Sequence, residues 1–197
     1  MAPLPLTFVQ SAARLHQLSE SRRELAIIGR SNVGKSSLIN ALAKRTKLAK
    51  TSKTPGATRL INIFEYGTEG SGDWVVDLPG YGYAKAPKRE QARWRQMIEE
   101  YLTESDALGA VLILIDGAVG PTPLDTQTIE WLDHIDLPYR FVATKADKVR
   151  SSKSRARRTD LTTKLGVQRS EVLWVSVPTG AGIDELRAEI REYFKED

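Results

Sequence analysis

A run of eight residues, 29–36, matches the pattern Gly-x-x-x-x-Gly-Lys-Ser/Thr. It follows apolar residues 25–28 and precedes amphipathic residues 37–42, so a strand should lead through a tight loop into a helix. In such a loop, backbone N–H groups and the helix N-terminus surround an anion such as a phosphate. Lys35 would reach the β- and γ-phosphates of a nucleotide, and Ser36 would offer its hydroxyl to Mg²⁺. The alternative, a glycine-rich turn that fits by chance, is disfavoured by the context on both sides.

A second motif, Asp-Leu-Pro-Gly at residues 77–80, follows the apolar residues 74–76. A carboxylate at that place could hold Mg²⁺ through a water molecule, and the N–H of Gly80 could contact a γ-phosphate. The pattern Asp-x-x-Gly is a weak signal alone, but here it accompanies a phosphate loop. We therefore expect Asp77 and Gly80 to lie beside that loop.

A third motif, Thr-Lys-Ala-Asp at residues 144–147, follows the apolar residues 141–143 and could recognise a base. The carboxylate of Asp147 can accept from both N1–H and the 2-amino group of guanine, a pairing that adenine lacks, while the stem of Lys145 covers the base. Such a site can reject the wrong base by as much as ~10⁴-fold, because its carboxylate would stay unpaired. A charged loop without this role is the alternative. After the last apolar strand, a backbone N–H near Ser176 could meet the guanine O6.

Composition limits the classes of protein that this chain can belong to. It has 197 residues, 41% hydrophobic and 27% charged, which is enough for one domain with a real core. Because there is no cysteine, disulfides and thiol chemistry are excluded. The first residues lack the features of a signal peptide, and no apolar run approaches the ~20 residues of a membrane span, which predicts a cytosolic protein. A net charge of +4 permits a polyanionic partner without demonstrating one.

Strands and helices alternate along most of the chain. Apolar runs predict six strands, at residues 25–28, 60–66, 74–77, 110–115, 141–143 and 172–175. Helical patterns occur at residues 37–43, 87–103, 124–134, 154–165 and 183–194. The connection between the second and third strands is short enough only for an antiparallel hairpin. This order predicts an α/β fold with a mostly parallel six-stranded sheet, one antiparallel edge strand and helices on both faces.

The first 23 residues show no pattern that indicates chemistry. Residues 11–15 could form a short helix, and we expect residues 1–23 to be an extension packed on the edge of the domain. Residues 24–197 would then form a single nucleotide-binding domain. Within it, residues 44–53 are polar, basic and aperiodic, which is typical of a mobile loop.

The motifs together resemble a known family. The phosphate loop, a loop threonine, Asp-Leu-Pro-Gly, Thr-Lys-Ala-Asp and a short serine loop occur in the order of translation-factor-type (TrmE-Era-EngA-like) GTPases, which have the Ras-like P-loop NTPase fold. Residues 77–84, with residues 54–56, closely resemble the bacterial EngB/YsxC family of ribosome-assembly GTPases, and the resemblance covers essentially the whole chain. The chain departs from the family pattern Thr-Pro-Gly-Lys-Thr-Gln at Ala57 and Arg59, and has Val177 where the family has Ser or Ala.

The resemblance implies GTP and GDP as ligands and Mg²⁺ as the metal ion. The catalytic residues would be Lys35, Thr58 and Gly80, and the Mg²⁺ ligands Ser36, Asp77 and Thr58, the last ordered only when a γ-phosphate is present. The nucleotide-binding residues would be Gly29, Arg30, Ser31, Asn32, Val33, Gly34, Lys35, Ser36, Ser37, Gly56, Ala57, Thr58, Arg59, Leu60, Asp77, Leu78, Pro79, Gly80, Thr144, Lys145, Ala146, Asp147, Val175, Ser176 and Val177. By the same resemblance, the chain would be a cytoplasmic monomer that acts in large ribosomal subunit assembly and normal cell division, and it would bind rRNA but neither membrane nor DNA.

Tyr81 stands where many small GTPases have a glutamine that orients the attacking water. A tyrosine cannot do this in the same way, and an aromatic side chain at the mouth of the site should turn away from it. The isolated protein would then hydrolyse GTP slowly, with its missing catalytic element supplied by a partner. The alternative is that another group positions the water equally well.

Basic residues gather in three clusters near the motifs. The clusters are Lys44, Arg45, Lys47, Lys50 and Lys53; Lys85, Lys88, Arg89, Arg93 and Arg95; and Arg150, Lys153, Arg155, Arg157 and Arg158. The first two flank elements that should move with the γ-phosphate, which would couple rRNA contact to the nucleotide state. A solvated charged face is the alternative, and for the third cluster it is the better interpretation.

Asn32, the fourth residue of the phosphate loop, raises the question of a monovalent cation. Several GTPases that resemble this chain at Asn32 and Tyr81 use the asparagine to help hold such a cation beside the phosphates. An amide oxygen is a neutral hard ligand suited to K⁺, which could take over part of the charge stabilisation that an arginine finger supplies elsewhere. The alternative is that Asn32 only forms hydrogen bonds across the loop.

Two other classes of protein remain open at this point. A P-loop ATPase of metabolism would need an adenine site and gives no reason for Asp147. A non-catalytic RNA-binding protein that uses GTP only as a structural ligand would bind GTP without turning it over.

Overall fold

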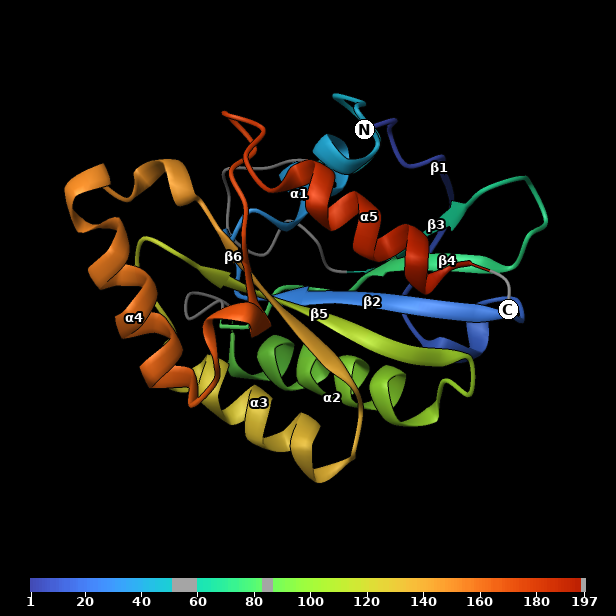
Figure 1. Cartoon of the computed structure of the whole chain (residues 1–197). Helices are drawn as coiled ribbons and strands as arrows, with labels where there is room; N and C mark the ends of the chain where they lie inside the picture. The colour runs from blue at the N-terminus through green and yellow to red at the C-terminus, as the bar shows by residue number, and fades with distance from the viewer. Residues whose placement is uncertain (51–59, 83–86, 196–197) are drawn as a thin grey trace.

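The structure, a computed structural model of the chain, describes residues 1–50, 60–82 and 87–195. Its strands form one sheet in the order β1-β3-β4-β2-β5-β6-β7 (Figure 1). The strands are β1 (Leu6–Ala12), β2 (Arg23–Gly29), β3 (Ile61–Tyr66), β4 (Asp73–Asp77), β5 (Leu108–Asp116), β6 (Tyr139–Thr144) and β7 (Val172–Trp174). The helices are α1 (Lys35–Leu42), α2 (Lys88–Glu104), α3 (Pro123–His134), α4 (Ser154–Leu165) and α5 (Ile183–Tyr193).

The sheet is parallel over β4, β2, β5, β6 and β7, while β3 runs antiparallel to both of its neighbours. The predicted α/β class, with a mostly parallel sheet and helices on both faces, is confirmed. The number of strands differs, because the described part of the chain contains seven strands and six were expected. The additional strand is β1, so that β3 lies one place inside the edge.

Strand β1 belongs to the N-terminal residues that were expected to pack on the domain as an extension. It pairs antiparallel with β3, from Leu6 opposite Tyr66 to Ala12 opposite Ile61, with a bulge between Phe8 and Gln10. Residues 11–15 were expected to form a short helix, which is wrong, since Ala12 ends the strand. The pairing supplies hydrogen-bond partners to the outer edge of β3, a requirement that the sequence of residues 1–23 does not reveal.

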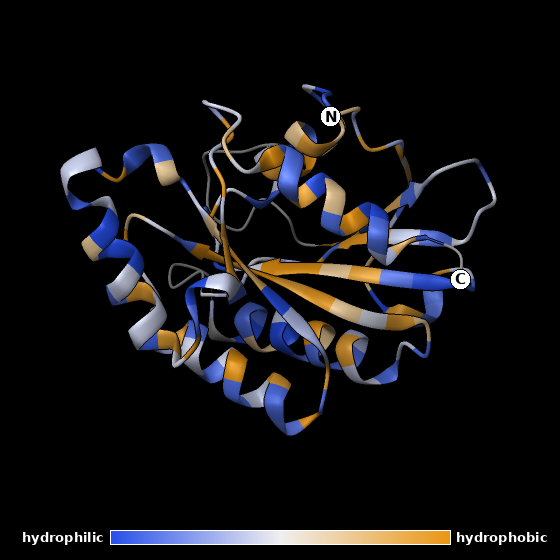
Figure 2. Cartoon of the chain, in the orientation of Figure 1, coloured by the Kyte–Doolittle hydropathy of each residue, from blue (hydrophilic) through white to orange (hydrophobic). Residues whose placement is uncertain are grey.

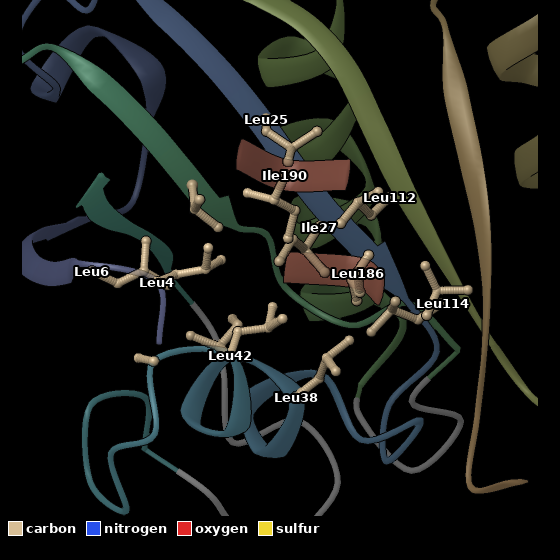
Figure 3. Packing of buried hydrophobic residues seen from close by; sticks show 14 of the residues in the cluster. Leu4, Leu6, Leu25, Ile27, Leu38, Leu42, Leu112, Leu114, Leu186 and Ile190 are labelled. Atoms are coloured by element: carbon tan, nitrogen blue, oxygen red, sulfur yellow. The ribbon is translucent and has the colours of Figure 1, made fainter. Parts of the chain in front are cut away.

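Each face of the sheet is covered by its own helices (Figure 1). On one face, α1 and α5 bury apolar side chains against β2 and β5, and Figure 3 shows this packing around Ile27, Leu112, Leu38 and Leu186. The other face packs against α2, α3 and α4 through residues such as Tyr101. Figure 2 shows the hydrophobic central strands between helices whose outer sides are hydrophilic. Strands buried on both faces explain the continuous apolar runs in the sequence.

Contacts at the end of α1 fix the helix that follows the phosphate loop. The guanidinium of Arg187, from α5, donates to the carbonyl oxygens of Leu42 and Ala41, at 3.0 and 2.6 Å. A cation at a helix C-terminus satisfies the last carbonyl groups and stabilises the helix dipole. The side chain of Asn40 also exchanges two hydrogen bonds of 2.8 Å with the backbone of Ala49. Helix α1 is therefore anchored at the end opposite to the candidate site.

Candidate nucleotide-binding site

The predicted motifs all lie at one edge of the sheet. Because β2, β4, β5, β6 and β7 are parallel, their carboxyl ends meet there (Figure 1). In open α/β sheets, ligands bind in the crevice outside these ends. The register places Asp77 beside Ile27, and Asp116 beside Thr144. The loops that follow these strands are therefore neighbours in space.

The phosphate loop begins at Gly29, the last residue of β2, and ends where α1 begins at Lys35. A side chain at Gly29 would lie 2.9 Å from the carbonyl oxygen of Leu114, so this close approach of two strands requires glycine. Gly34 caps α1 in the left-handed conformation, with φ 106°. The first turn of an α-helix has N–H groups without intrahelical acceptors, and α1 directs these groups toward the loop. The predicted anion-binding geometry is thus consistent with the backbone of residues 29–37.

Lys35 and Asp77 contact each other at the centre of this edge. The ammonium group of Lys35 donates to Asp77 Oδ1. Both side chains are buried, and Asn62 Nδ2 lies 3.3 Å from the other carboxylate oxygen of Asp77. The structure therefore brings together the phosphate-loop lysine and the carboxylate of the second motif, 42 residues apart in the chain.

The side chains near Asp77 can be compared with what a Mg²⁺ ion needs. Magnesium is usually bound by one or two carboxylates together with hydroxyl, water and substrate phosphate oxygens. Ser36 is in the first turn of α1, next to Lys35, and Asp77 ends β4. The described residues contain no cluster of three or more His, Cys, Asp or Glu that could hold a metal by themselves. One hydroxyl and one carboxylate fit a magnesium ion that completes its shell with phosphates and water.

The second motif is hydrogen-bonded to the phosphate loop. Ser31 N–H donates to the carbonyl oxygen of Tyr81 at 2.9 Å, and Tyr81 N–H donates to that of Gly29 at 3.2 Å. Gly80 lies so close to the loop that an added Cβ would be 3.0 Å from the nitrogen of Ser31. Leu78 and Pro79 are buried beneath these contacts. As predicted, Asp77 and Gly80 lie beside the phosphate loop.

Tyr81 turns toward α3, as the sequence predicted for an aromatic side chain at this position. Its hydroxyl donates to Asp125 Oδ1 at 2.8 Å, and the other oxygen of Asp125 accepts from the N–H and hydroxyl of Thr122. Burial is the main reason why the pKa of Tyr81 is raised well above its ordinary value, and the charge of Asp125 raises it further. The phenol is thus held neutral in a structural contact at the first turn of α3.

The third motif is tied to the phosphate loop by two side chains. Thr144 Oγ1 donates to the carbonyl oxygen of Val33 at 2.7 Å, and Lys145 Nζ donates to that of Asn32 at 2.7 Å. Both Asn32 and Lys145 have positive φ angles, 66° and 57°. In Asn32 the side-chain amide has no hydrogen-bond partner among the described residues, so the cross-loop hydrogen bond offered as the alternative role of this side chain is not formed.

Asp147 and Ser176 face each other across the last two loops. Ser176 Oγ donates to Asp147 Oδ1 at 2.7 Å, and Ala146 N–H donates to the carbonyl oxygen of Val175 at 3.1 Å. Ser176 is buried while Asp147 is exposed. Since a carboxylate can accept at about four positions, one hydroxyl donor leaves room for two N–H groups of a base. Val177, the next residue after Ser176, is exposed.

Asp116, at the end of β5, is a site residue that none of the predicted motifs includes. Its Oδ2 accepts from Lys145 Nζ at 2.6 Å, and its Oδ1 accepts from the N–H groups of Ala118 and Val119. These contacts hold the ammonium group of Lys145 between Asp116 and the phosphate loop. The signal was present in the sequence, because Asp116 is the first polar residue after a continuous apolar run.

Part of the predicted site lies outside the described residues. This part comprises Gly56, Ala57, Thr58 and Arg59. The role of Thr58 as the second Mg²⁺ ligand therefore stays a prediction. Leu60 is described, and it is 40% exposed directly before β3.

The basic clusters differ in how their side chains are engaged. Exposed members of the first two are Lys44, Arg45, Lys47, Lys50, Arg89, Arg93 and Arg95, while Lys53, Lys85 and the side chain of Lys88 lie outside the described residues. In the third cluster, Arg157 pairs with Asp160 at 3.0 Å, and Arg158 lies over the ring of Trp174 at 4.8 Å. Part of the third cluster is therefore engaged by the protein itself. Among the described helices, none has the length and apolar composition needed to span a membrane.

Comparisons with known proteins agree with this geometry. Residues 24–145 match a family described as "50S ribosome-binding GTPase". A protein of Desulforapulum autotrophicum named "Probable GTP-binding protein EngB" is 42% identical over 93% of this chain and 93% of its own length. Another protein with that name, from Mannheimia succiniciproducens, is 42% identical over 95% of this chain and 91% of its own. A crystal structure of "a probable GTP-binding protein engB" superimposes with a TM-score of 0.69 and 27% identity, covering 86% of this chain and 97% of that one.

The matched family begins at the second strand of the chain and ends at Lys145, so it spans the phosphate loop, the Asp77–Gly80 motif and the start of the base motif. The two relatives extend the similarity over nearly the whole chain. A GTPase domain is the function shared by these matches, and GTP and GDP are its ligands. The chain therefore belongs to the EngB family of GTP-binding proteins.

Proposed function

We propose that this protein is a slow GTPase that acts as a nucleotide-dependent switch in the assembly of the large ribosomal subunit, in the cytoplasm, and that normal growth and cell division depend on it. The observation that carries the proposal is the convergence of the three motifs at one edge of the sheet. Lys35 contacts Asp77, and Thr144 and Lys145 contact the carbonyl oxygens of the phosphate loop. A ligand that engages all three must carry both phosphates and a base.

In this proposal each motif binds one part of GTP. The N–H groups of residues 29–37 and the ammonium of Lys35 hold the phosphates, and Ser36 and Asp77 hold Mg²⁺, with Thr58 added when GTP is bound. Asp147 reads the guanine edge, while Ser176 holds its carboxylate in place at 2.7 Å. Lys145, positioned by Asp116, covers the base. Asn32 has an exposed side chain at the phosphate loop, where its amide oxygen could help to hold K⁺.

The position of Tyr81 supports the proposal that hydrolysis is slow. Its hydroxyl is engaged with Asp125, so it offers no amide-like group to orient a water at the γ-phosphate. A partner would have to complete the catalytic site or order the loop that carries Thr58. The name of the matched family, a 50S ribosome-binding GTPase, supports the large ribosomal subunit as that partner.

Single-round GTP turnover by the purified protein tests this account, measured alone and with purified large or small ribosomal subunits. We expect slow turnover alone and a marked increase with large subunits only. In parallel, binding to large subunits should weaken steeply with salt, and reversing the charges of Arg89 and Arg93 should flatten that dependence, because phosphate contacts release counterions. Turnover that neither subunit changes, together with salt-insensitive binding, would contradict the proposed function.

A further inference from the structure

The segment that contains Gly80 stays attached to β2 beyond the end of β4. The N–H groups of Leu78 and Tyr81 donate to carbonyl oxygens of β2, at 3.3 and 3.2 Å. Between these two residues lie Pro79, which has no N–H, and Gly80, which has no side chain. Gly80 is therefore the position at which this stretch of backbone turns most freely.

Ser31, the third residue of the phosphate loop, contacts this free position. Its Oγ donates to the carbonyl oxygen of Gly80 at 3.3 Å, and its N–H donates to that of Tyr81 at 2.9 Å. The peptide group that joins Gly80 to Tyr81 is therefore held at its carbonyl by the phosphate loop and at its N–H by the end of β2. A Cβ added to Gly80 would lie 3.0 Å from the nitrogen and 3.1 Å from the Cα of Ser31, so the two backbones touch.

The N–H of Gly80 is left available by these contacts. Among the described residues, no acceptor takes a hydrogen bond from it. In the proposed function this N–H meets the γ-phosphate, and a donor that is oriented in advance stabilises the charge that develops there at no further cost of reorganisation. The direction of the N–H depends on the torsion angles of Gly80, and Ser31 restricts these angles because it holds the carbonyl group of the same residue.

We propose that Ser31 is a positioning residue for GTP hydrolysis, whose hydroxyl holds the backbone of Gly80 so that the N–H of Gly80 is directed at the γ-phosphate in the transition state. The inference rests on the proposed function, in which Gly80 serves the γ-phosphate, and it gives the side chain of Ser31 a role beyond nucleotide binding. Because the hydroxyl of Tyr81 is engaged with Asp125, the rate of the isolated protein depends on contacts such as this one.

This role differs in its consequences from simpler ones at the same residue. A serine that only bound the nucleotide would affect GDP and GTP alike, because both carry the phosphates that the loop surrounds. A positioning residue instead changes the rate and the affinity for a transition-state analogue, and leaves the affinity for GDP as it was. These three quantities therefore separate the two roles.

The test compares the full chain with Ser31→Ala and Ser31→Thr, and uses Thr46→Ala as the matched control, since Thr46 is an exposed hydroxyl residue outside the predicted nucleotide site. Single-round GTP turnover should fall about five- to ten-fold in Ser31→Ala, the size of one hydrogen bond between neutral groups. Ser31→Thr keeps the hydroxyl and should retain most of the rate. Affinity for GDP with aluminium fluoride, which imitates the transferred phosphate, should fall in Ser31→Ala by the same factor as the rate, while affinity for fluorescent GDP should not change.

The positioning role of Ser31 is overturned if Ser31→Ala turns GTP over as fast as Thr46→Ala does, or if its affinity for GDP falls as much as its rate. A loss of rate in Ser31→Thr equal to that in Ser31→Ala would also overturn it, since the hydroxyl would then not matter. Faster turnover in Ser31→Ala would show that the contact holds Gly80 away from the γ-phosphate, which is the opposite role.

Adding large ribosomal subunits to the same assay separates this inference from the proposed function. If the subunits leave the turnover of the unmodified protein unchanged, the proposed function fails. If they accelerate the unmodified protein and Ser31→Ala to the same rate, and the two proteins also have the same rate alone, only the role of Ser31 is wrong.

Discussion

The ammonium group of Lys35 and the carboxylate of Asp77 form a buried ion pair at the carboxyl edge of the sheet. One residue comes from the start of α1 and the other from the end of β4, so the pair joins the phosphate loop to the second motif. A nucleotide with Mg²⁺ would provide each member with a new partner, the phosphates for Lys35 and the metal ion for Asp77. The pair therefore marks the point where nucleotide binding and local stability are coupled.

Replacement of this lysine should affect both properties. Lys35→Ala removes a charge-assisted contact to the phosphates and should reduce GDP affinity by about 1.5–3 kcal/mol. It also leaves Asp77 buried without its cation, which should cost about 3–5 kcal/mol of stability in the absence of nucleotide. Ser36→Ala should weaken nucleotide binding only in the presence of Mg²⁺. Calorimetric titration and urea unfolding measure these effects, with the exposed Lys47→Ala as the control; unchanged GDP affinity in Lys35→Ala would remove this lysine from the site.

Base recognition is tested at Asp147. Asp147→Asn replaces a double acceptor by a group with one acceptor and one donor, which suits xanthine better than guanine. GTP affinity should fall by about 2–3 kcal/mol, the scale of a hydrogen bond to a charged group plus an unsatisfied polar atom, and XTP should compete better than it does in the unmodified protein. Ser176→Ala, which removes the 2.7 Å hydrogen bond to Asp147, should weaken GTP binding less. Competition by unlabelled GTP, XTP and ATP against fluorescent GDP gives the answer, and GTP affinity that the asparagine does not lower would refute the assignment.

The contact of Tyr81 with Asp125 predicts a dependence of stability on alkaline pH. The pKa of Tyr81 is raised above its ordinary value of 10.0, mainly by burial. Below pH 10 the phenol is neutral in both folded and unfolded protein, and its full contribution is present. Above pH 10 the unfolded chain ionises first, so this contribution is lost as pH rises, by at most about 1.4 kcal/mol per pH unit.

The variant Tyr81→Phe lacks the ionising group. It should be less stable than the unmodified protein by about 1 kcal/mol at pH 8, because a hydrogen bond to a buried carboxylate is lost. The difference should shrink between pH 10 and pH 11. Urea unfolding across this pH series measures it, with Phe8→Leu as a control whose difference should not change with pH. A constant difference for Tyr81→Phe would show that the phenol is not held as the structure has it.

Asn32 provides the test of the cation. If its amide oxygen helps to hold K⁺ beside the phosphates, GTP turnover should be faster in K⁺ than in Na⁺ at the same ionic strength, and Asn32→Ala should abolish the difference. An arginine finger accelerates GTP hydrolysis by up to ~10³–10⁵-fold. Because the cation would take over part of this role, even a partial acceleration by K⁺ should be easy to measure. Thr46→Ala is a suitable control, since Thr46 is exposed and lies outside the predicted nucleotide site. Equal rates in the two salts, with and without ribosomal subunits, would end the idea.

Much of the fold could be predicted because most strands are buried on both faces. Continuous apolar runs such as residues 110–115 have few alternatives to a central parallel strand. Strand β1 was missed because its side chains do not alternate clearly: Phe8 and Val9 are both exposed, and a bulge interrupts the register between Phe8 and Gln10. Such an edge strand is decided by the unpaired edge of β3, a tertiary requirement that local sequence does not carry.

The candidate site could be predicted as far as motifs specify it. The backbone roles of Gly29 and Gly34 and the pairing of strand ends follow from spacing and from the parallel sheet. The contact of Asp116 with Lys145, and that of Tyr81 with Asp125, join residues 29 and 44 positions apart. Asp116, Tyr81 and Asp125 lie outside the three motifs, so only the folded arrangement reveals these two contacts. The family match also excludes a metabolic ATPase, a class of protein in which Asp147 would have no evident role.

Sucrose-gradient sedimentation of the protein with ribosomal subunits, in GDP and in a non-hydrolysable GTP analogue, tests the central claim most directly. A nucleotide-dependent switch in large-subunit assembly should travel with the large subunit in the GTP analogue and remain at the top of the gradient in GDP. Thr58→Ala should bind GDP normally but fail to sediment with the subunit in either nucleotide. Identical sedimentation of the unmodified protein in both nucleotides, or association with the small subunit instead, would contradict the account.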